Sequence, residues 1–182
     1  GNVVNTSCPS TWKLNKKHCE QILKIKSDSV IFTITDYNKN PEADALFINL
    51  IDSQYESVFF WPQGSGDIEY FSKLIIPRKD KIIVLQPKLE SYDSLITTSR
   101  PDYIGTRLHA GIRSLQAKNR SLIITIDNRA KEIADNIGIE ISERGNLEKI
   151  LSFIKNDSKN HIQIPALEIE RWKDQFRLGS SE

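Results

Sequence analysis

The residues best suited to chemistry in this sequence are an arginine and a histidine two positions apart, in the segment Gly105-Thr106-Arg107-Leu108-His109. A strand-like stretch ends at Gly105 and a helix-like one follows, with Thr106 as its expected cap. The first turn of a helix offers free backbone N–H groups and a positive dipole end, which both favour an anion. A guanidinium grips a carboxylate or phosphate at two points, and an imidazole exchanges protons near neutral pH. Arg107 and His109 therefore predict an anion site with proton transfer; the alternative is a surface ion pair and a capping histidine.

Three further loops carry polar residues where predicted strands end. The turn Gly64-Ser65-Gly66 either presents backbone N–H groups to a phosphate or is a plain turn, since it lacks the P-loop lysine and the full dinucleotide fingerprint. Asp36 and Asp127 either bind a sugar hydroxyl or act as a base, or they cap a loop or helix. Arg129 either adds positive charge to the site or is solvated. Metal-ligand spacing and a serine-nucleophile motif are both missing from the sequence, so we expect no metal, no cofactor and no serine hydrolysis.

Strand-like and helix-like segments alternate along the chain, which predicts that these loops lie together. The predicted strands cover residues 29–35, 58–61, 81–85, 102–105, 122–126 and 139–141. The predicted helices cover residues 41–54, 68–74, 89–97, 107–117, 128–137, 147–154 and 165–176. Alternation of this kind, with continuous apolar runs in the strands, predicts a doubly wound parallel α/β sheet of five or six strands. Ligands of such sheets bind outside the carboxyl ends of the strands, where all four loops are placed.

Length and composition restrict the class of protein. The 182 residues are enough for one ordinary domain, with 38% hydrophobic and 27% charged residues. We expect a domain over residues 1–155, followed by a linker and a C-terminal helix over 156–182 that packs on the same domain through Ile169, Trp172 and Phe176. A net charge of +1 disfavours a nucleic-acid partner, and no apolar run approaches the roughly 20 residues of a membrane-spanning helix.

Cysteine and methionine usage adds two expectations. Cys8 and Cys19 are read as reduced thiols of a cytoplasmic protein, with a disulfide in an oxidising compartment as the alternative. The sequence contains no methionine, even at position 1, so we read it as an excised fragment whose partner segment lies upstream.

Three segments of the chain resemble the C-terminal half of the polysaccharide pyruvyl transferase family. They are Gly-Thr-Arg-Leu-His-Ala-Gly-Ile-Arg-Ser-Leu-Gln-Ala at 105–117, Ser-Leu-Ile-Ile-Thr-Ile-Asp-Asn-Arg-Ala-Lys at 121–131 and Asn-Ile-Gly-Ile at 136–139. The Arg-Leu-His triplet is the most specific mark. Asn-Thr-Ser-Cys-Pro at 5–9 with Trp12, and Phe-Trp-Pro-Gln-Gly-Ser-Gly-Asp at 60–67, also resemble members, so the likeness covers roughly residues 1–140 and not the tail.

The resemblance implies one Rossmann-like half of a GT-B-like architecture, with the donor bound in the cleft against an N-terminal domain of the same chain. The family transfers pyruvate from phosphoenolpyruvate to sugar hydroxyls of surface polysaccharides, which produces ketals. Carried over, Arg107 holds the anionic donor and His109 protonates its methylene carbon. Members often have Tyr-Asp-x-Lys after the fifth strand, whereas this chain has Ile126-Asp127-Asn128-Arg129, so the acceptor side departs from the pattern. The implied location is the cytoplasm, including the inner face of the membrane.

Two other functions fit the same pattern. The chain is alternatively the nucleotide-sugar-binding half of a GT-B glycosyltransferase, because that fold also places basic residues at helix starts. It is otherwise a binding or regulatory module without catalysis, in which Arg107 and His109 are structural. Stabilisation by UDP or GDP rather than by phosphoenolpyruvate favours the glycosyltransferase, and full activity after replacement of both residues favours the binding module.

Overall fold

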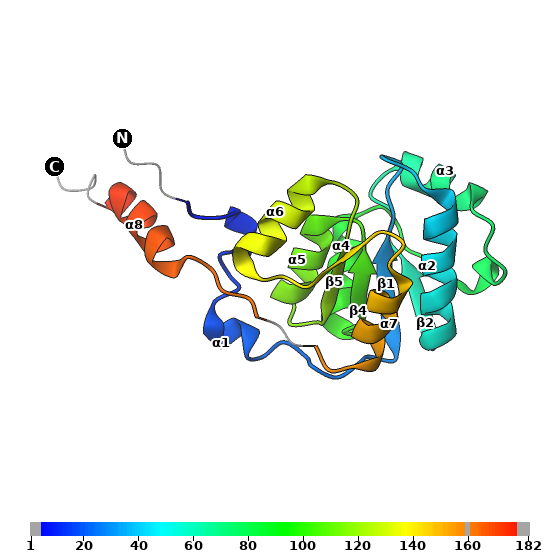
Figure 1. Cartoon of the computed structure of the whole chain (residues 1–182), viewed down its shortest axis with the longest axis horizontal. Coiled ribbons are helices and arrows are strands. Elements are labelled where there is room, and N and C mark those ends of the chain that lie inside the picture. The colour runs from blue at the N-terminus through cyan, green and yellow to red at the C-terminus, as the bar shows by residue number, and fades with distance from the viewer. Residues whose placement is uncertain (1–4, 159–160, 178–182) are drawn as a thin grey trace.

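The six strands of this chain are all parallel and lie in the order β3-β2-β1-β4-β5-β6, with helices on both faces of the sheet. A computed structural model describes residues 5–158 and 161–177 (Figure 1). The strands are β1 (Ser29–Thr33), β2 (Ser57–Phe60), β3 (Ile83–Val84), β4 (Asp102–Gly105), β5 (Ser121–Thr125) and β6 (Ile141–Glu143). This strand order is that of the Rossmann fold, so the prediction of a doubly wound α/β domain is confirmed.

The helices form one layer on each face of the sheet (Figure 1). One apolar cluster joins the sheet to α2 (Pro41–Gln54), α3 (Ser65–Lys73) and α7 (Leu147–Lys155). A second cluster joins its other face to α4 (Leu89–Thr98), α5 (Leu108–Gln116) and α6 (Asn128–Ile137). Because β1 leads to a helix on one face and β4 to a helix on the other, the loops after these neighbouring strands diverge and leave a crevice between them.

Local sequence signals explain where most helices begin and end. Asn40 caps α2 by accepting a hydrogen bond from the Ala43 N–H at 3.1 Å, and Pro41 takes the first helical position. Gly138 ends α6 in the left-handed conformation, with φ of 73°, as predicted. The last strand differs from its prediction: β6 begins at Ile141, because the Ile139 N–H still bonds to the Ala134 carbonyl and closes the helix at residue 139.

The N-terminal segment contains two short helices that the sequence analysis did not predict, the 3-10 turn η1 (Pro9–Thr11) and α1 (Lys16–Cys19). The C-terminal helix α8 (Ala166–Arg177) lies beside this segment and extends away from the sheet (Figure 1). Its Trp172 ring meets the Trp12 ring edge-on, with centroids 5.1 Å apart. Ile169 is buried, whereas Trp172 and Phe176 are exposed. The assignment of residues 156–182 to the same domain stays a prediction.

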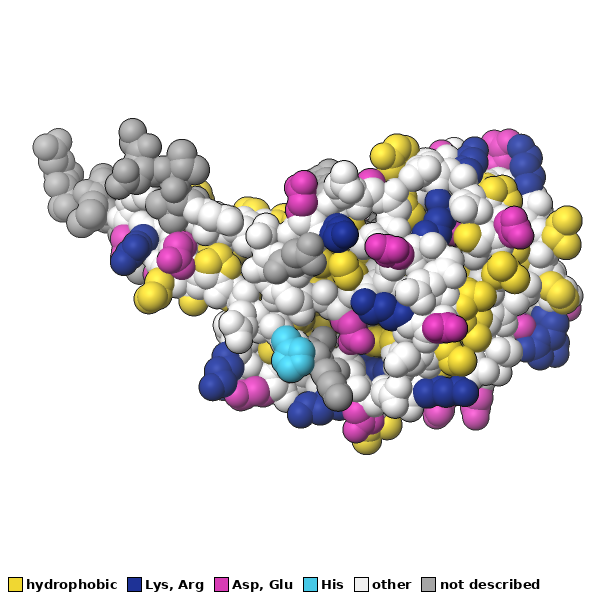
Figure 2. Space-filling model, viewed as in Figure 1, with side chains coloured by type: hydrophobic (Ala, Val, Ile, Leu, Met, Phe, Trp, Pro, Cys, Tyr) yellow, Lys and Arg dark blue, Asp and Glu magenta, His cyan; other side chains and the backbone are white. Residues whose placement is uncertain are grey.

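Charged side chains of both signs are interspersed over the face in Figure 2 and do not form a patch of one sign there. This distribution agrees with the net charge of +1. Over the part of the chain that the structure describes, no helix is at once long and apolar enough to cross a membrane.

A buried ion pair lies at the amino ends of β4 and β5, whereas the crevice lies at the carboxyl ends of the strands. Arg120 and Asp102 are 0% and 1% exposed, and Nη1 of the arginine lies 3.1 Å from Oδ2 of the carboxylate. The Tyr55 hydroxyl donates to the same oxygen at 2.7 Å. Nη2 of Arg120 donates to the carbonyls of Phe153 and Asn156, so one guanidinium joins β4 and β5 to the end of α7.

The buried carboxyl of Asp102 gives folding a specific pH dependence. Desolvation raises the pKa of Asp102 to about 6, although Arg120 and Tyr55 oppose the shift. The unfolded carboxyl titrates near its usual 3.8. The folded protein therefore binds an extra proton between these values, so this group's contribution to stability is full below pH 4 and is lost as the pH rises through 6. We expect the stability of the native protein relative to Asp102→Asn to fall by about 3 kcal/mol from pH 4 to 7.

Denaturant titrations of both proteins at several pH values measure this difference. A carboxyl ¹³C NMR titration of Asp102 should also have its midpoint near 6. A midpoint below 4 together with a pH-independent difference would contradict the prediction.

Candidate functional site

The candidate site lies in the crevice between the carboxyl ends of β1 and β4, where Thr33 pairs with Gly105. A glycine is required at this point, because a Cβ on Gly105 would lie 2.6 Å from the Thr33 backbone nitrogen. The Thr106 N–H donates to the Thr33 carbonyl at 3.0 Å, which extends the pairing of the two strands by one residue. Thr106 is buried, and its prediction as the helix cap was wrong: Arg107, with an extended backbone, is the cap residue of α5.

The backbone of Arg107 is held from both sides. Its N–H donates to the Thr33 hydroxyl at 3.2 Å, and its carbonyl accepts a hydrogen bond from the Tyr103 hydroxyl at 2.8 Å. The two hydroxyls are themselves 2.7 Å apart in the buried core. This network fixes the direction in which α5 leaves the sheet, and therefore the placement of every group in its first turn.

Asp67 of α3 organises the site, and the sequence analysis assigned it no role. Both of its oxygens accept hydrogen bonds from Nη2 of Arg107, at 2.8 and 2.9 Å. The Asp36 and Gln63 backbone N–H groups each donate to one of these oxygens at 3.0 Å. With its side chain only 1% exposed, Asp67 joins the loops after β1, β2 and β4. An aspartate in the first turn of a helix that follows Gly-Ser-Gly is the signal that sequence reasoning could have used.

Arg107 is thus anchored rather than free. Its side chain is 29% exposed and lies within 4.0 Å of the Asp36 carboxylate as well as on Asp67. Its Nε is buried and has no hydrogen-bond partner among the described residues. The guanidinium therefore has a fixed plane and keeps hydrogen-bonding capacity that the protein does not use.

His109 is the second residue of α5 and its side chain is exposed. The first backbone N–H groups of any helix lack intrahelical partners, and among the described residues no side chain caps the start of α5. His109, Arg107 and Thr106 line a cavity of about 240 Å³ at this point. The other lining residues are Thr35, Tyr37, Leu108, Ile126, Asp127 and Ala130. The structure therefore brings Thr106 and Arg107 of the loop between β4 and α5, and His109 of α5, together with Asp127, as predicted site residues that share one cavity.

Asp127 belongs to this cavity and also caps a helix. Its side chain accepts a hydrogen bond from the Ala130 N–H at 3.3 Å at the start of α6. The Asn38 side chain donates to the Ile126 carbonyl at 2.7 Å, which ties the loop after β1 to the loop after β5. The structure does not describe the Arg129 side chain, so the prediction that it adds positive charge to the site lies outside the described residues.

The turn Gly64-Ser65-Gly66 forms the start of α3, and a carboxylate already lies against it. A Cβ on Gly66 would be only 2.1 Å from Oδ2 of Asp36, so this helix start faces a negative charge. The roles of the turn and of Asp36 in ligand binding stay predictions.

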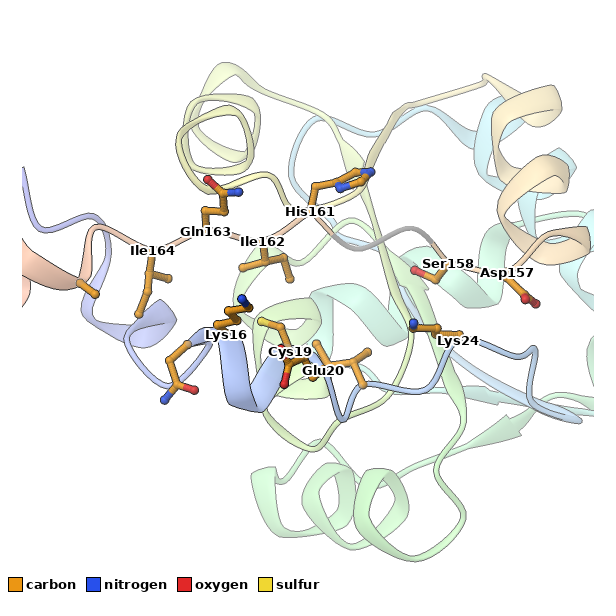
Figure 3. A pocket seen from close by; sticks show the side chains of 13 residues that line it. Lys16, Cys19, Glu20, Lys24, Asp157, Ser158, His161, Ile162, Gln163 and Ile164 are labelled. Carbon is orange, nitrogen blue, oxygen red and sulfur yellow. The ribbon is translucent and has the colours of Figure 1, made fainter.

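A cavity of about 850 Å³ lies away from these loops, between α1 and residues 161–166 (Figure 3). Cys19 and Ile162 face one another across it, and charged side chains such as Lys16 and Glu20 also line it. It has no part in the arrangement of Arg107 and His109.

Comparison of the chain with protein-family models, curated proteins and solved structures gives no match.

Proposed function

We propose that this chain is the donor-binding half of a pyruvyl transferase, which transfers pyruvate from phosphoenolpyruvate to sugar hydroxyls of a surface polysaccharide or its precursor. The resemblance of residues 105–117 to that family supports the proposal. The observation that carries it is the cavity of about 240 Å³ where the uncapped start of α5, the fixed guanidinium of Arg107 and the exposed imidazole of His109 meet.

Each group has a role in this reaction. The helix start and Arg107 bind the negative groups of phosphoenolpyruvate, while Asp67 keeps the guanidinium in its plane. His109 gives a proton to the methylene carbon, which becomes a methyl group as a sugar hydroxyl bonds to the neighbouring carbon. The bond between that carbon and the phosphate oxygen then breaks, phosphate leaves with the electron pair, and a second hydroxyl of the same sugar bonds to the carbon to complete the ketal. Each hydroxyl gives up its proton as it bonds, the first to the imidazole that has lost its own and the second to solvent or the leaving phosphate.

The acceptor is a saccharide that enters from the side of Asp127 and Tyr37. Asp127 lies on the loop where the family pattern has a tyrosine that this chain lacks. Tyr37, from the loop after β1, lines the same cavity and supplies an aromatic ring there. Asp36, whose half-exposed carboxylate lies within 4.0 Å of the Arg107 guanidinium, is a second candidate for a sugar hydroxyl. An N-terminal domain of the same protein would close the cleft, in the cytoplasm or at the inner face of the membrane.

Donor binding by this chain tests the proposal, because the start of α5, Arg107 and its partner Asp67, which are the groups proposed to bind the donor, all lie on this chain. We expect phosphoenolpyruvate to stabilise the protein against heat, and Arg107→Lys to weaken its affinity about 10-fold, since a lysine keeps the charge but loses the planar fork. Arg107→Ala should weaken it about 100-fold. His109→Gln should bind the donor within a few-fold of the native protein, and the chain alone should not complete the transfer.

Isothermal titration calorimetry measures these affinities. Arg78→Ala is the matched control, because Arg78 makes a similar pair with Asp52 outside the crevice. Native affinity in Arg107→Ala would overturn the proposal. Stabilisation by UDP or GDP but not by phosphoenolpyruvate would instead support the glycosyltransferase half, which the Rossmann strand order favours as the second candidate.

A further inference from the structure

A cysteine from the N-terminal segment lies against the histidine of the candidate site. Sγ of Cys8 is 3.8 Å from Nε2 of His109, although 101 positions separate the two residues. The Ser10 hydroxyl lies 3.1 Å from the same sulfur. Cys8 is only partly buried and His109 is exposed, so a small molecule can reach both groups. A thiol beside an imidazole is the arrangement that produces nucleophilic sulfur in proteins.

The fold holds this pair in place. The Cys8 carbonyl accepts hydrogen bonds from the Thr11 N–H at 2.8 Å and the Thr11 hydroxyl at 2.6 Å, which closes the turn η1. The Gln116 side chain, at the end of α5, donates to the Ser10 carbonyl. The segment that carries Cys8 is therefore fastened to the same helix that carries His109.

Space for a reactant lies beside the pair. His109 also lines a second cavity, of about 470 Å³. Pro9 and Ser10, the two residues after Cys8, form part of its wall, so open space adjoins both the imidazole and the segment that carries the thiol.

We propose that Cys8 and His109 form a thiol–imidazole pair that is covalently modified by soft carbon electrophiles, of which α,β-unsaturated carbonyl compounds are the natural class. Nε2 of His109 takes the thiol proton, and the sulfur electron pair forms a bond to the β-carbon. The electron pair of the carbon–carbon double bond then takes the proton back from the imidazolium at the α-carbon. The reaction is an addition, so it needs no oxidant and releases no leaving group.

Cys19, the second cysteine, is an internal reference for the reaction rate of Cys8. The Cys19 thiol donates to the Leu14 carbonyl at 3.3 Å, so a backbone oxygen and not an imidazole is its hydrogen-bond partner. Burial also raises the pKa of the Cys19 thiol, which lowers its thiolate fraction near neutral pH. Reaction rates at the two sites of one folded molecule can therefore be compared directly.

Iodoacetamide labelling followed by peptide mass spectrometry tests the proposal. In this reaction iodide leaves and the thiol proton stays on the imidazole or passes to solvent. We expect Cys8 of the folded chain at pH 7 to be alkylated at least about 10-fold faster than Cys19. His109→Ala and His109→Gln should each slow the reaction at Cys8 about 10-fold and leave the Cys19 rate unchanged, which also shows that the fold is intact. His161→Ala is the matched control and should leave the Cys8 rate unchanged.

Equal rates at Cys8 and Cys19 in the native protein, or a Cys8 rate that is unchanged in both His109 variants, would overturn the proposal. Acrylamide, an unsaturated carbonyl compound, should give the same order of rates. None of these reactions contains phosphoenolpyruvate, so the result is independent of whether the chain binds that donor.

Discussion

Arg120→Ala is expected to lower the free energy of unfolding by about 3–5 kcal/mol at pH 7 and the melting temperature by about 10 °C. The variant leaves the Asp102 carboxylate buried with Tyr55 as its main partner, and it removes the bonds to the Phe153 and Asn156 carbonyls. Because Arg120 lowers the pKa of Asp102, its loss favours the protonated carboxyl. The destabilisation should therefore be smaller at pH 5 than at pH 7.

Denaturant unfolding at the two pH values measures this effect. Arg113→Ala is the matched control: its pair with Asp93 has side chains 42% and 35% exposed, so its loss should cost less than about 1 kcal/mol. The double variant Asp102→Asn/Arg120→Met should lose less free energy of unfolding than the two single variants lose together, since neither charge remains buried. Equal destabilisation by Arg120→Ala and Arg113→Ala would contradict the structural role of the buried pair.

Asp67→Ala is expected to lower the free energy of unfolding by about 3 kcal/mol and to weaken donor binding about 10-fold. The variant leaves the Asp36 and Gln63 N–H groups without their acceptor, and each unsatisfied buried donor costs about 1–3 kcal/mol. It also frees the Arg107 side chain, so the donor would have to order the guanidinium on binding. Asp67→Asn keeps acceptor capacity in its amide oxygen and should lose about half as much stability.

Thermal unfolding and calorimetric titration with phosphoenolpyruvate measure both effects. Asp52→Ala removes the partner of the more exposed Arg78 and should change stability by less than about 1 kcal/mol, with native donor affinity. If Asp67→Ala binds the donor as tightly as the native protein does, Asp67 has no part in positioning Arg107 for binding.

The alternation of strands and helices could be predicted from the sequence because its signals are local. Asn40 before Pro41 and the glycine at 138 act within one turn of their own helix, so the boundaries that they set agree with the structure. The start of α5 was misplaced because Thr106 is engaged by Thr33, a residue 73 positions earlier on the neighbouring strand. A preference for cap residues depends only on the neighbouring sequence, so it cannot predict such a contact.

The location of the candidate site could be predicted from the sequence, but the partners that its residues contact could not. Parallel strand order places the loops after β1, β4 and β5 at one edge, which brings Thr106, Arg107, His109 and Asp127 to one cavity. The partners of these residues come from far along the chain. Asp67 is 40 positions before Arg107 and Cys8 is 101 positions before His109, so neither contact leaves a pattern in sequence spacing.

The crystal structure of this chain soaked with phosphoenolpyruvate is the most direct test of donor binding at α5. We expect a negative group of the donor within about 3 Å of the backbone N–H groups that open the helix and of the Arg107 guanidinium, with its methylene carbon facing the His109 imidazole. A donor bound instead at the start of α3 or in the cavity beside α1, at a concentration that saturates the protein in solution, would show that Arg107 and His109 do not form its site.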